Sequence, residues 1–277
     1  MVKSTALWFV LPALVASAFA EPRPTDKQTS DLSRDSIVRL VVQIQRADYE
    51  GDRAALQRLY GDLIPIPQEK KLASRLHYWR GFALWRRAIN GFNDSVDSKD
   101  LQQDLTQALD EFDNATANDP GFVDAKVGAG SCLSLLAFSV NENKPARVQA
   151  LVARAGPLFK EIMAAAPDNP RLLWVVGPNL WYAPPEHGGG QDKAMAAYQK
   201  GLNAVREHKE SSSDPLEPTW GEPELLMNLA WSNLNRTTPD LTAAQENAQA
   251  ALKLVPYWHY VRDILMPQIR AAQAKAH

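Results

Sequence analysis

The sequence has a single cysteine among its 277 residues, so it cannot form an intramolecular disulfide. Cys132 lies in an apolar helical pattern, and its sequence neighbours include no histidine or basic residue that would lower its pKa. We therefore expect a buried and chemically inert thiol. Without cross-links, the stability of the fold must come from the burial of apolar side chains.

Runs of like charge are also absent. The chain has 30 Lys and Arg against 32 Asp and Glu, and its formal net charge is −2. A nucleic acid or an anionic membrane would require a basic patch, so the sequence predicts neither as a partner. Beyond the first 20 residues no stretch is apolar enough to cross a bilayer, and no membrane span is expected in the mature chain.

Motifs for metal binding and catalysis are missing as well. The five histidines show no ligand spacing, so we expect no metal and no other cofactor. The residue order of a phosphate-binding loop and the Gly-x-Ser-x-Gly of a hydrolase do not occur. The acidic residues Asp110, Glu111 and Asp113 are expected on a solvated helix face, where two carboxyl pKa values are not driven apart. The sequence therefore favours a protein that is not an enzyme and has no catalytic residues.

The first 20 residues have the features of a secretory signal peptide. Lys3 precedes a short apolar run, and Ala18 and Ala20 are the small residues that a signal peptidase requires, which makes Glu21 the expected first mature residue. Residues 21–32 are polar and contain proline, and we interpret them as a flexible leader. The expected location is outside the cytoplasm, either periplasmic or secreted.

One spacing recurs along the rest of the chain. An alanine is followed by an apolar residue four positions on, a small or apolar residue three positions later, and a proline five positions after that. Three copies are complete and one lacks only the proline: Ala108/Phe112/Ala115/Pro120, Ala155/Phe159/Ile162/Pro167, Ala244/Ala248/Ala251/Pro256 and Ala194/Tyr198/Gly201. This pattern is typical of the second helix of a tetratricopeptide (TPR) repeat, where the small residue lets two helices approach and the ring fills the groove.

The spacing predicts an all-α fold: an irregular TPR-like α-solenoid of about five helical hairpins within residues 33–277, closed by a C-terminal capping helix. The expected units are 35–67, 79–120, 124–167, 170–206 and 223–256, and the capping helix covers 257–274. Residues 207–218 are expected to be a polar insertion between the last two units. Pro267 is expected to kink the capping helix.

The sequence offers one candidate binding region, between residues 174 and 190. Aromatic residues gather before two prolines, and a glycine triplet precedes a helix, where backbone N–H groups could meet an anion. An alternative is that the aromatic side chains only pack between hairpins and that the glycines only form a tight turn. The candidate residues for a ligand or partner are Trp174, Asn179, Trp181, Tyr182, His187, Gly188, Gly189 and Gly190.

Three segments carry a resemblance to known proteins: residues 76–88, 182–194 and 256–261. The chain resembles exported bacterial TPR proteins of largely uncharacterised role over most of its mature length. Around the glycine triplet it is also similar to the periplasmic T-component of TRAP transporters, although the lipid-anchor cysteine common in that family is absent. These resemblances imply a helical repeat fold and export, and they supply no catalytic residues.

Two functional hypotheses follow. The first is an exported scaffold that binds a protein or peptide through its concave face, as arrays of helical hairpins commonly do. The second is a periplasmic protein that binds a small solute or assists transport, with an aromatic pocket near residues 174–190.

Overall fold

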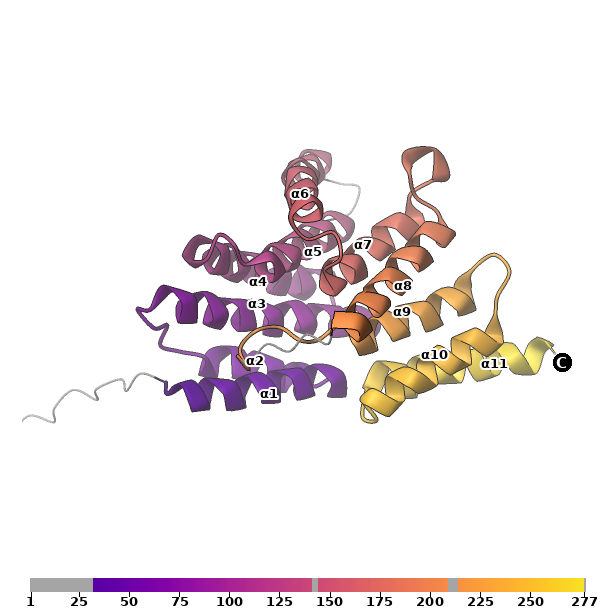
Figure 1. Ribbon diagram of the computed structural model, residues 1–277, viewed down its shortest axis with the longest axis horizontal. Helices are drawn as coiled ribbons and strands as arrows, with labels where there is room; N and C mark the ends of the chain where they lie inside the picture. The colour runs from indigo at the N-terminus through magenta and orange to yellow at the C-terminus, as the bar shows by residue number, and fades with distance from the viewer. Residues whose placement is uncertain (1–31, 141–143, 209–213, 277) are drawn as a thin grey trace, which may run out of the picture. The chain divides into compact units, whose positions relative to one another are not determined.

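Successive helices pair along the chain and form five hairpins. The structure is a computed structural model that describes residues 32–140, 144–208 and 214–276. The helix pairs are α1 (Arg34–Glu50) with α2 (Arg53–Asp62), α3 (Lys70–Asn93) with α4 (Ser98–Asn118), α5 (Val123–Ser139) with α6 (Pro145–Ala165), α7 (Pro170–Tyr182) with α8 (Gln191–His208), and α9 (Glu222–Asn235) with α10 (Leu241–Leu254). In these described ranges there are helices and no strands, which confirms the all-α prediction (Figure 1). The predicted signal peptide and the leader up to residue 31 lie outside the described residues.

Short polar side chains begin several of these helices. Ser33, Asn169 and Asp240 each accept a hydrogen bond from the backbone N–H three residues further along the chain. Each bond satisfies one of the N–H groups that the first turn of a helix leaves without a partner. At the other end of α1, Gly51 has a φ of 72°, a left-handed conformation that ends a helix and that glycine adopts without strain.

The aromatic residues of the repeated spacing lie against glycines of the preceding helix. A β-carbon built on Gly130 of α5 would lie 2.9 Å from Phe159 of α6, and one on Gly177 of α7 would lie 1.9 Å from Tyr198 of α8. Both distances are shorter than real carbon contacts. The absence of a side chain at these glycines therefore sets how closely the two helices of each hairpin approach.

We expect Gly177→Ala to lower the free energy of unfolding by about 1–3 kcal/mol, because the added methyl group would overlap Tyr198. Urea unfolding followed by circular dichroism would measure the change. Gly156→Ala in α6 is the matched control, since its β-carbon would meet nothing within 4 Å. The free energy of unfolding of this control should rise by about 0.5–1 kcal/mol, because a glycine inside a helix usually lowers stability by that amount relative to alanine. Unchanged stability of the Gly177 variant would show that the Tyr198 side chain is not held in place.

The C-terminal segment covers the last hairpin, as expected for a cap, but it is not a regular α-helix throughout. A π-helical stretch, η2 (Tyr260–Leu265), precedes α11 (Met266–Ala276), and the Met266 N–H donates to the Val261 carbonyl five residues earlier. Pro267 has no N–H, and in a regular α-helix its ring would clash with the carbonyl four residues before it. The wider turn relieves that clash, so the irregularity precedes the proline. Both η2 and α11 pack against α10.

The polar insertion predicted at residues 207–218 does separate the last two hairpins, but its described part after α8 is not confined to the surface. Residues 214–221, here called the crossing segment, run over α3 and bury two apolar side chains. Leu216 is 0% exposed and Trp220 is 6% exposed. The Leu216 carbonyl accepts a hydrogen bond of 2.8 Å from the Trp79 indole, and the Trp220 indole donates one of 2.8 Å to the Tyr78 hydroxyl. The crossing segment is therefore part of the core.

The first hairpin also contacts the last one. The Tyr49 hydroxyl at the end of α1 donates a 2.8 Å hydrogen bond to Glu224 of α9, and the rings of Tyr49 and Trp258 lie 5.1 Å apart. His259 packs against Gly51 in the turn between α1 and α2. The hairpins therefore curve far enough for α1 to meet α9 and the residues after α10.

The prediction of a solvated acidic face on α4 is wrong for Glu111, which is 8% exposed. Its carboxylate accepts hydrogen bonds from Arg80 (2.9 Å) and Tyr60 (3.2 Å) and lies 2.7 Å from His77 Nδ1. Burial alone would raise the pKa of Glu111, but the bonds from His77 and Arg80 outweigh it and hold that pKa below its ordinary value. Glu111 thus joins the second hairpin to the first.

Candidate functional site

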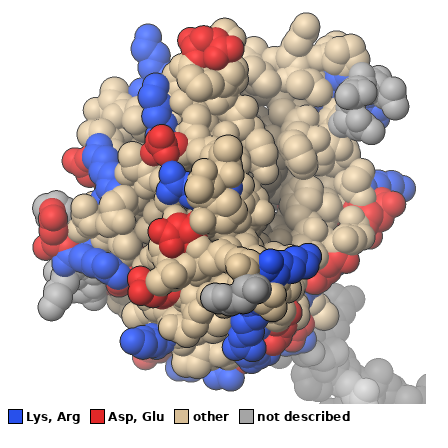
Figure 2. Space-filling model, turned by 90° about the vertical axis from the view of Figure 1, so that its right-hand side faces the viewer, with Lys and Arg blue, Asp and Glu red and all other residues tan. Residues whose placement is uncertain are grey.

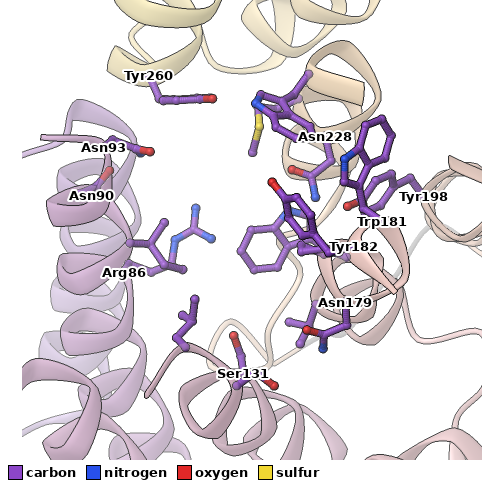
Figure 3. Close-up of a pocket in the computed structure, with 18 of the residues that line it drawn as sticks. Arg86, Asn90, Asn93, Ser131, Asn179, Trp181, Tyr182, Tyr198, Asn228 and Tyr260 are labelled. Carbon is purple, nitrogen blue, oxygen red and sulfur yellow. The ribbon is translucent and has the colours of Figure 1, made fainter. Parts of the chain in front are cut away.

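A cavity of about 310 Å³ opens between the first helices of four hairpins, α3, α5, α7 and α9. Its polar lining includes Arg86, Asn90, Asn93, Ser131, Asn179 and Asn228, and its aromatic lining includes Trp174, Trp181, Tyr182, Tyr198, Trp231, Trp258 and Tyr260. Figure 3 shows these side chains arriving from several helices and surrounding one open space. The first helices of four hairpins thus contribute most of the residues that line this cavity.

One face of the molecule has a hollow with few charged residues around it. Figure 2 shows one face of the molecule with a hollow bordered mainly by residues that are neither basic nor acidic. Lys, Arg, Asp and Glu lie further out on this face. Any molecule in this hollow would therefore meet mainly uncharged residues.

The structure brings together four of the eight candidate residues that the sequence indicates. Trp174, Asn179, Trp181 and Tyr182 all line the cavity. The Trp181 ring lies 5.2 Å from the Trp231 ring of α9 in an edge-to-face arrangement, so it both packs between hairpins and faces the cavity. The two alternatives for these aromatic residues, packing and pocket lining, are thus compatible.

The other four candidates lie outside the cavity. Gly189 and Gly190 line a neighbouring surface groove, while His187 and Gly188 are exposed and line neither. The three glycine N–H groups donate to carbonyls nearby: Gly188 to Pro185, Gly189 to Pro184, and Gly190 to Leu180. The triplet therefore has no backbone donor left for an anion. Its positive φ values, 85° at Gly188 and 113° at Gly190, are those of a tight turn.

Arg86 of α3 lies at the wall of the cavity and is only 3% exposed. Its Nε donates 2.7 Å to Asp48 and its Nη2 lies 3.5 Å from Glu224, while its Nη1 has no hydrogen-bond partner among the described residues. Burial alone would lower the pKa of Arg86, but the two carboxyl groups raise it above its ordinary value. The guanidinium therefore stays charged, and one of its nitrogens has no partner in the described part of the chain.

Glu224 lies behind Arg86 and is completely buried. Burial raises the pKa of Glu224 above its ordinary value, and the attraction of Arg86 opposes that shift without cancelling it. One of its oxygens, Oε1, accepts the Tyr49 hydrogen bond, and within the described part of the chain Oε2 has no partner. The buried environment thus favours the neutral carboxyl form.

We expect Glu224→Gln to flatten part of the pH dependence of stability. A raised folded-state pKa means that the carboxyl binds a proton more tightly in the folded chain. The contribution of Glu224 to the free energy of unfolding is therefore greatest below the pKa that this carboxyl has in the unfolded chain. It is lost as the pH rises through the pKa in the folded chain, by up to about 1.4 kcal/mol per pH unit. Urea unfolding of wild type and variant from pH 4 upwards would measure this. A wild-type stability that instead rises through this window relative to the Gln variant would contradict the assignment.

The sequence analysis did not predict the polar residues of α3 that line the cavity. Arg86, Asn90 and Asn93 recur at helical spacing with Phe82, and this places them on one face of the helix. That periodicity was visible in the sequence. The partners that give Arg86 its environment lie on α1 and α9, far away in the chain, and local spacing does not reveal them.

Other chemistry receives no support from the described residues. Within residues 32–140, 144–208 and 214–276 no three His, Cys, Asp or Glu side chains gather in a way that could hold a metal ion. Cys132 is 0% exposed, and burial raises the pKa of its thiol well above the ordinary value, as expected for an inert cysteine. The helices of the described ranges are all too short or too polar to cross a membrane.

Comparison with known proteins finds a weak similarity to a solved structure. No protein-family model and no curated protein matches the chain. Among solved structures, the chain is similar to a thermophilic TPR protein of Thermus thermophilus, with 18% identity over 87% of this chain and 100% of that one, and a TM-score of 0.49. A likeness this weak shows neither a ligand nor a partner.

Proposed function

We propose that the protein is a non-catalytic binding protein that takes a compact ligand into the cavity on its concave face. The observation that carries this proposal is that the protein's own crossing segment covers first helices beside the cavity, namely α3 and α7. Trp220 lies against Phe82, Trp85 and Trp174, with ring centres 5.5–5.7 Å apart. An extended peptide lying along the first helices would have to displace this buried segment.

The cavity has the properties of a small-molecule site. Its volume of about 310 Å³ falls at the lower end of the range found for ligand pockets, about 300–1,000 Å³. Aromatic side chains form a large part of the lining, and a few amide and hydroxyl groups could fix the orientation of the ligand. These features favour the second of the two hypotheses drawn from the sequence.

A protein partner is the second candidate function. Arrays of helical hairpins generally serve as protein-binding scaffolds, and this chain exposes large apolar side chains away from its core. Phe138 at the end of α5 is 81% exposed, and Val152 on α6 is 57% exposed. These residues do not line the cavity, so the two functions can be separated by mutation.

The proposal includes export, with cleavage after Ala20. It is supported only by the sequence of the first 20 residues. N-terminal sequencing of the protein recovered from the periplasm of a bacterial host should give Glu21 as the first residue. A protein that stays in the cytoplasm with Met1 intact would exclude export.

The ligand proposal is tested by mass spectrometry of what the purified protein releases on denaturation. We expect a small molecule from the wild type and from Phe138→Ala, and its loss from Trp181→Ala, because only Trp181 lines the cavity. Both substitutions remove an aromatic side chain, which makes them a matched pair. Equal amounts of the molecule from all three proteins would exclude the cavity as its site. A protein that copurifies with wild type and Trp181→Ala but not with Phe138→Ala would support the scaffold function instead.

A further inference from the structure

The cavity wall contains two buried N–H donors that no group of the described residues satisfies. They are Arg86 Nη1 and Trp174 Nε1, and neither has a hydrogen-bond partner in the part of the chain that the structure describes. The guanidinium carbon of Arg86 lies 5.2 Å from the centre of the Trp174 ring, so the two side chains are neighbours in the wall. In Figure 3 the Arg86 guanidinium points into the open space. A buried donor without an acceptor costs about 1–3 kcal/mol, and a ligand oxygen would remove that cost.

The charge around these donors is already balanced. Arg86 is the only charged residue in the described wall of the cavity, and Asp48 pairs with it directly from behind. Glu224 approaches the same guanidinium at 3.5 Å. A carboxylate or phosphate would therefore add negative charge to a buried site in which Asp48 already balances Arg86, and it would find no unbalanced positive charge. A neutral carbonyl oxygen can accept both hydrogen bonds without that penalty.

Flat aromatic surfaces form much of the remaining wall. Trp174 and Trp181 come from α7, Trp231 from α9 and Tyr260 from η2, and all four line the cavity. Indole and phenol rings make their best contacts with another planar group, by offset stacking or edge-to-face packing. The shape and the chemistry of the wall therefore both favour a planar ligand.

We infer that the cavity binds a neutral, planar ring compound whose carbonyl oxygen accepts hydrogen bonds from Arg86 and Trp174. This inference rests on the proposed function and specifies the ligand class for the same site. Aromatic amides and lactams belong to this class. Carboxylates of the same shape and hydrocarbons without an acceptor do not.

Three probes of similar size test the inference on the whole mature protein at pH 7: 2-naphthamide, 2-naphthoate and 2-methylnaphthalene. Isothermal titration calorimetry would give their dissociation constants. We expect the amide to bind about tenfold more tightly than either of the others, the discrimination expected from one or two buried hydrogen bonds. A naphthoate that binds as tightly as the amide, or more tightly, would overturn the neutral-ligand assignment. A hydrocarbon that binds as tightly as the amide would overturn the role of the donors.

Trp174→Phe removes one donor and keeps an aromatic ring, so it tests that donor without breaking the Arg86–Asp48 pair. It should reduce the preference for the amide over the hydrocarbon severalfold. Trp231→Phe makes the same change elsewhere in the wall and should leave the preference unchanged. Equal preferences in wild type and Trp174→Phe would overturn the part assigned to Trp174.

Failure of this inference can be told apart from failure of the proposed function. If none of the probes binds while mass spectrometry still shows a molecule that is lost from Trp181→Ala, the cavity binds another class of ligand and only the inference is wrong. If neither the probes nor a natural molecule binds, both are wrong.

Discussion

Replacing Trp220 with alanine is expected to lower the free energy of unfolding by about 3–5 kcal/mol, the range observed when large buried aromatic side chains are truncated. Trp220 is 6% exposed, and its ring contacts Phe82, Trp85 and Trp174. The substitution also removes the hydrogen bond from its indole to the Tyr78 hydroxyl, which is fully buried. Urea unfolding monitored by circular dichroism would measure the loss.

Phe138→Ala serves as the control for Trp220→Ala, because it removes an aromatic side chain that is 81% exposed. Its effect should stay within about 0.5 kcal/mol, as is usual for surface substitutions. A Trp220 variant as stable as this control would mean that the crossing segment lies on the surface and does not belong to the core. The concave face would then be open, and the argument for a compact ligand would lose its basis.

The second large loss of stability is expected when the buried ion pair between Arg86 and Asp48 is broken. Arg86→Met should lower the free energy of unfolding by about 3–5 kcal/mol, because it leaves the buried Asp48 carboxylate without its charged partner. Both side chains of the pair are 3% exposed, and Nε and the carboxylate oxygen are 2.7 Å apart. Methionine is apolar and replaces the aliphatic part of the arginine side chain, so the loss would combine the unpaired Asp48 charge with the space left by the guanidinium.

A double variant separates these two contributions. Asp48→Asn removes the negative charge but keeps an oxygen that can accept the hydrogen bond from Asn90. Arg86→Met combined with Asp48→Asn should therefore be more stable than Arg86→Met alone. Arg206→Met is the surface control, because the Arg206 side chain is 50% exposed in its pair with Glu222 and such pairs contribute about 0–1 kcal/mol. A double variant no more stable than the single one would show that packing dominates at Arg86.

The repeat fold could be predicted from the sequence because its signals are local. An alanine, an aromatic residue and a closing proline at fixed helical spacing describe one groove between two adjacent helices. The structure places each of them as expected, with Ala108, Phe112 and Ala115 all 0% exposed. Gly130 against Phe159 and Gly177 against Tyr198 repeat the same contact. Neighbouring helices of a hairpin are also neighbours in the sequence, so periodicity alone identifies them.

The features that the sequence did not reveal depend on contacts between distant residues. In the stretch 207–218 serines, prolines and charges outnumber the apolar residues, and nothing local indicates that Leu216 will meet Trp79, which lies 137 positions earlier. Glu111 was expected in water, because its partners Arg80 and Tyr60 belong to earlier helices. The candidate site was predicted in part for the same reason. The aromatic residues near 174–182 were conspicuous, whereas Arg86 and Asn228 acquire their place only when α3 and α9 come together.

The contact between Tyr49 and the residues that follow α10 affects how the domain unfolds. In an open array each terminal unit can detach while the others persist, so unfolding proceeds in stages. Here the two terminal units hold each other through Tyr49, Glu224 and Trp258. Loosening either one deprives the other of its support, and residues 32–276 should therefore melt in one concerted step.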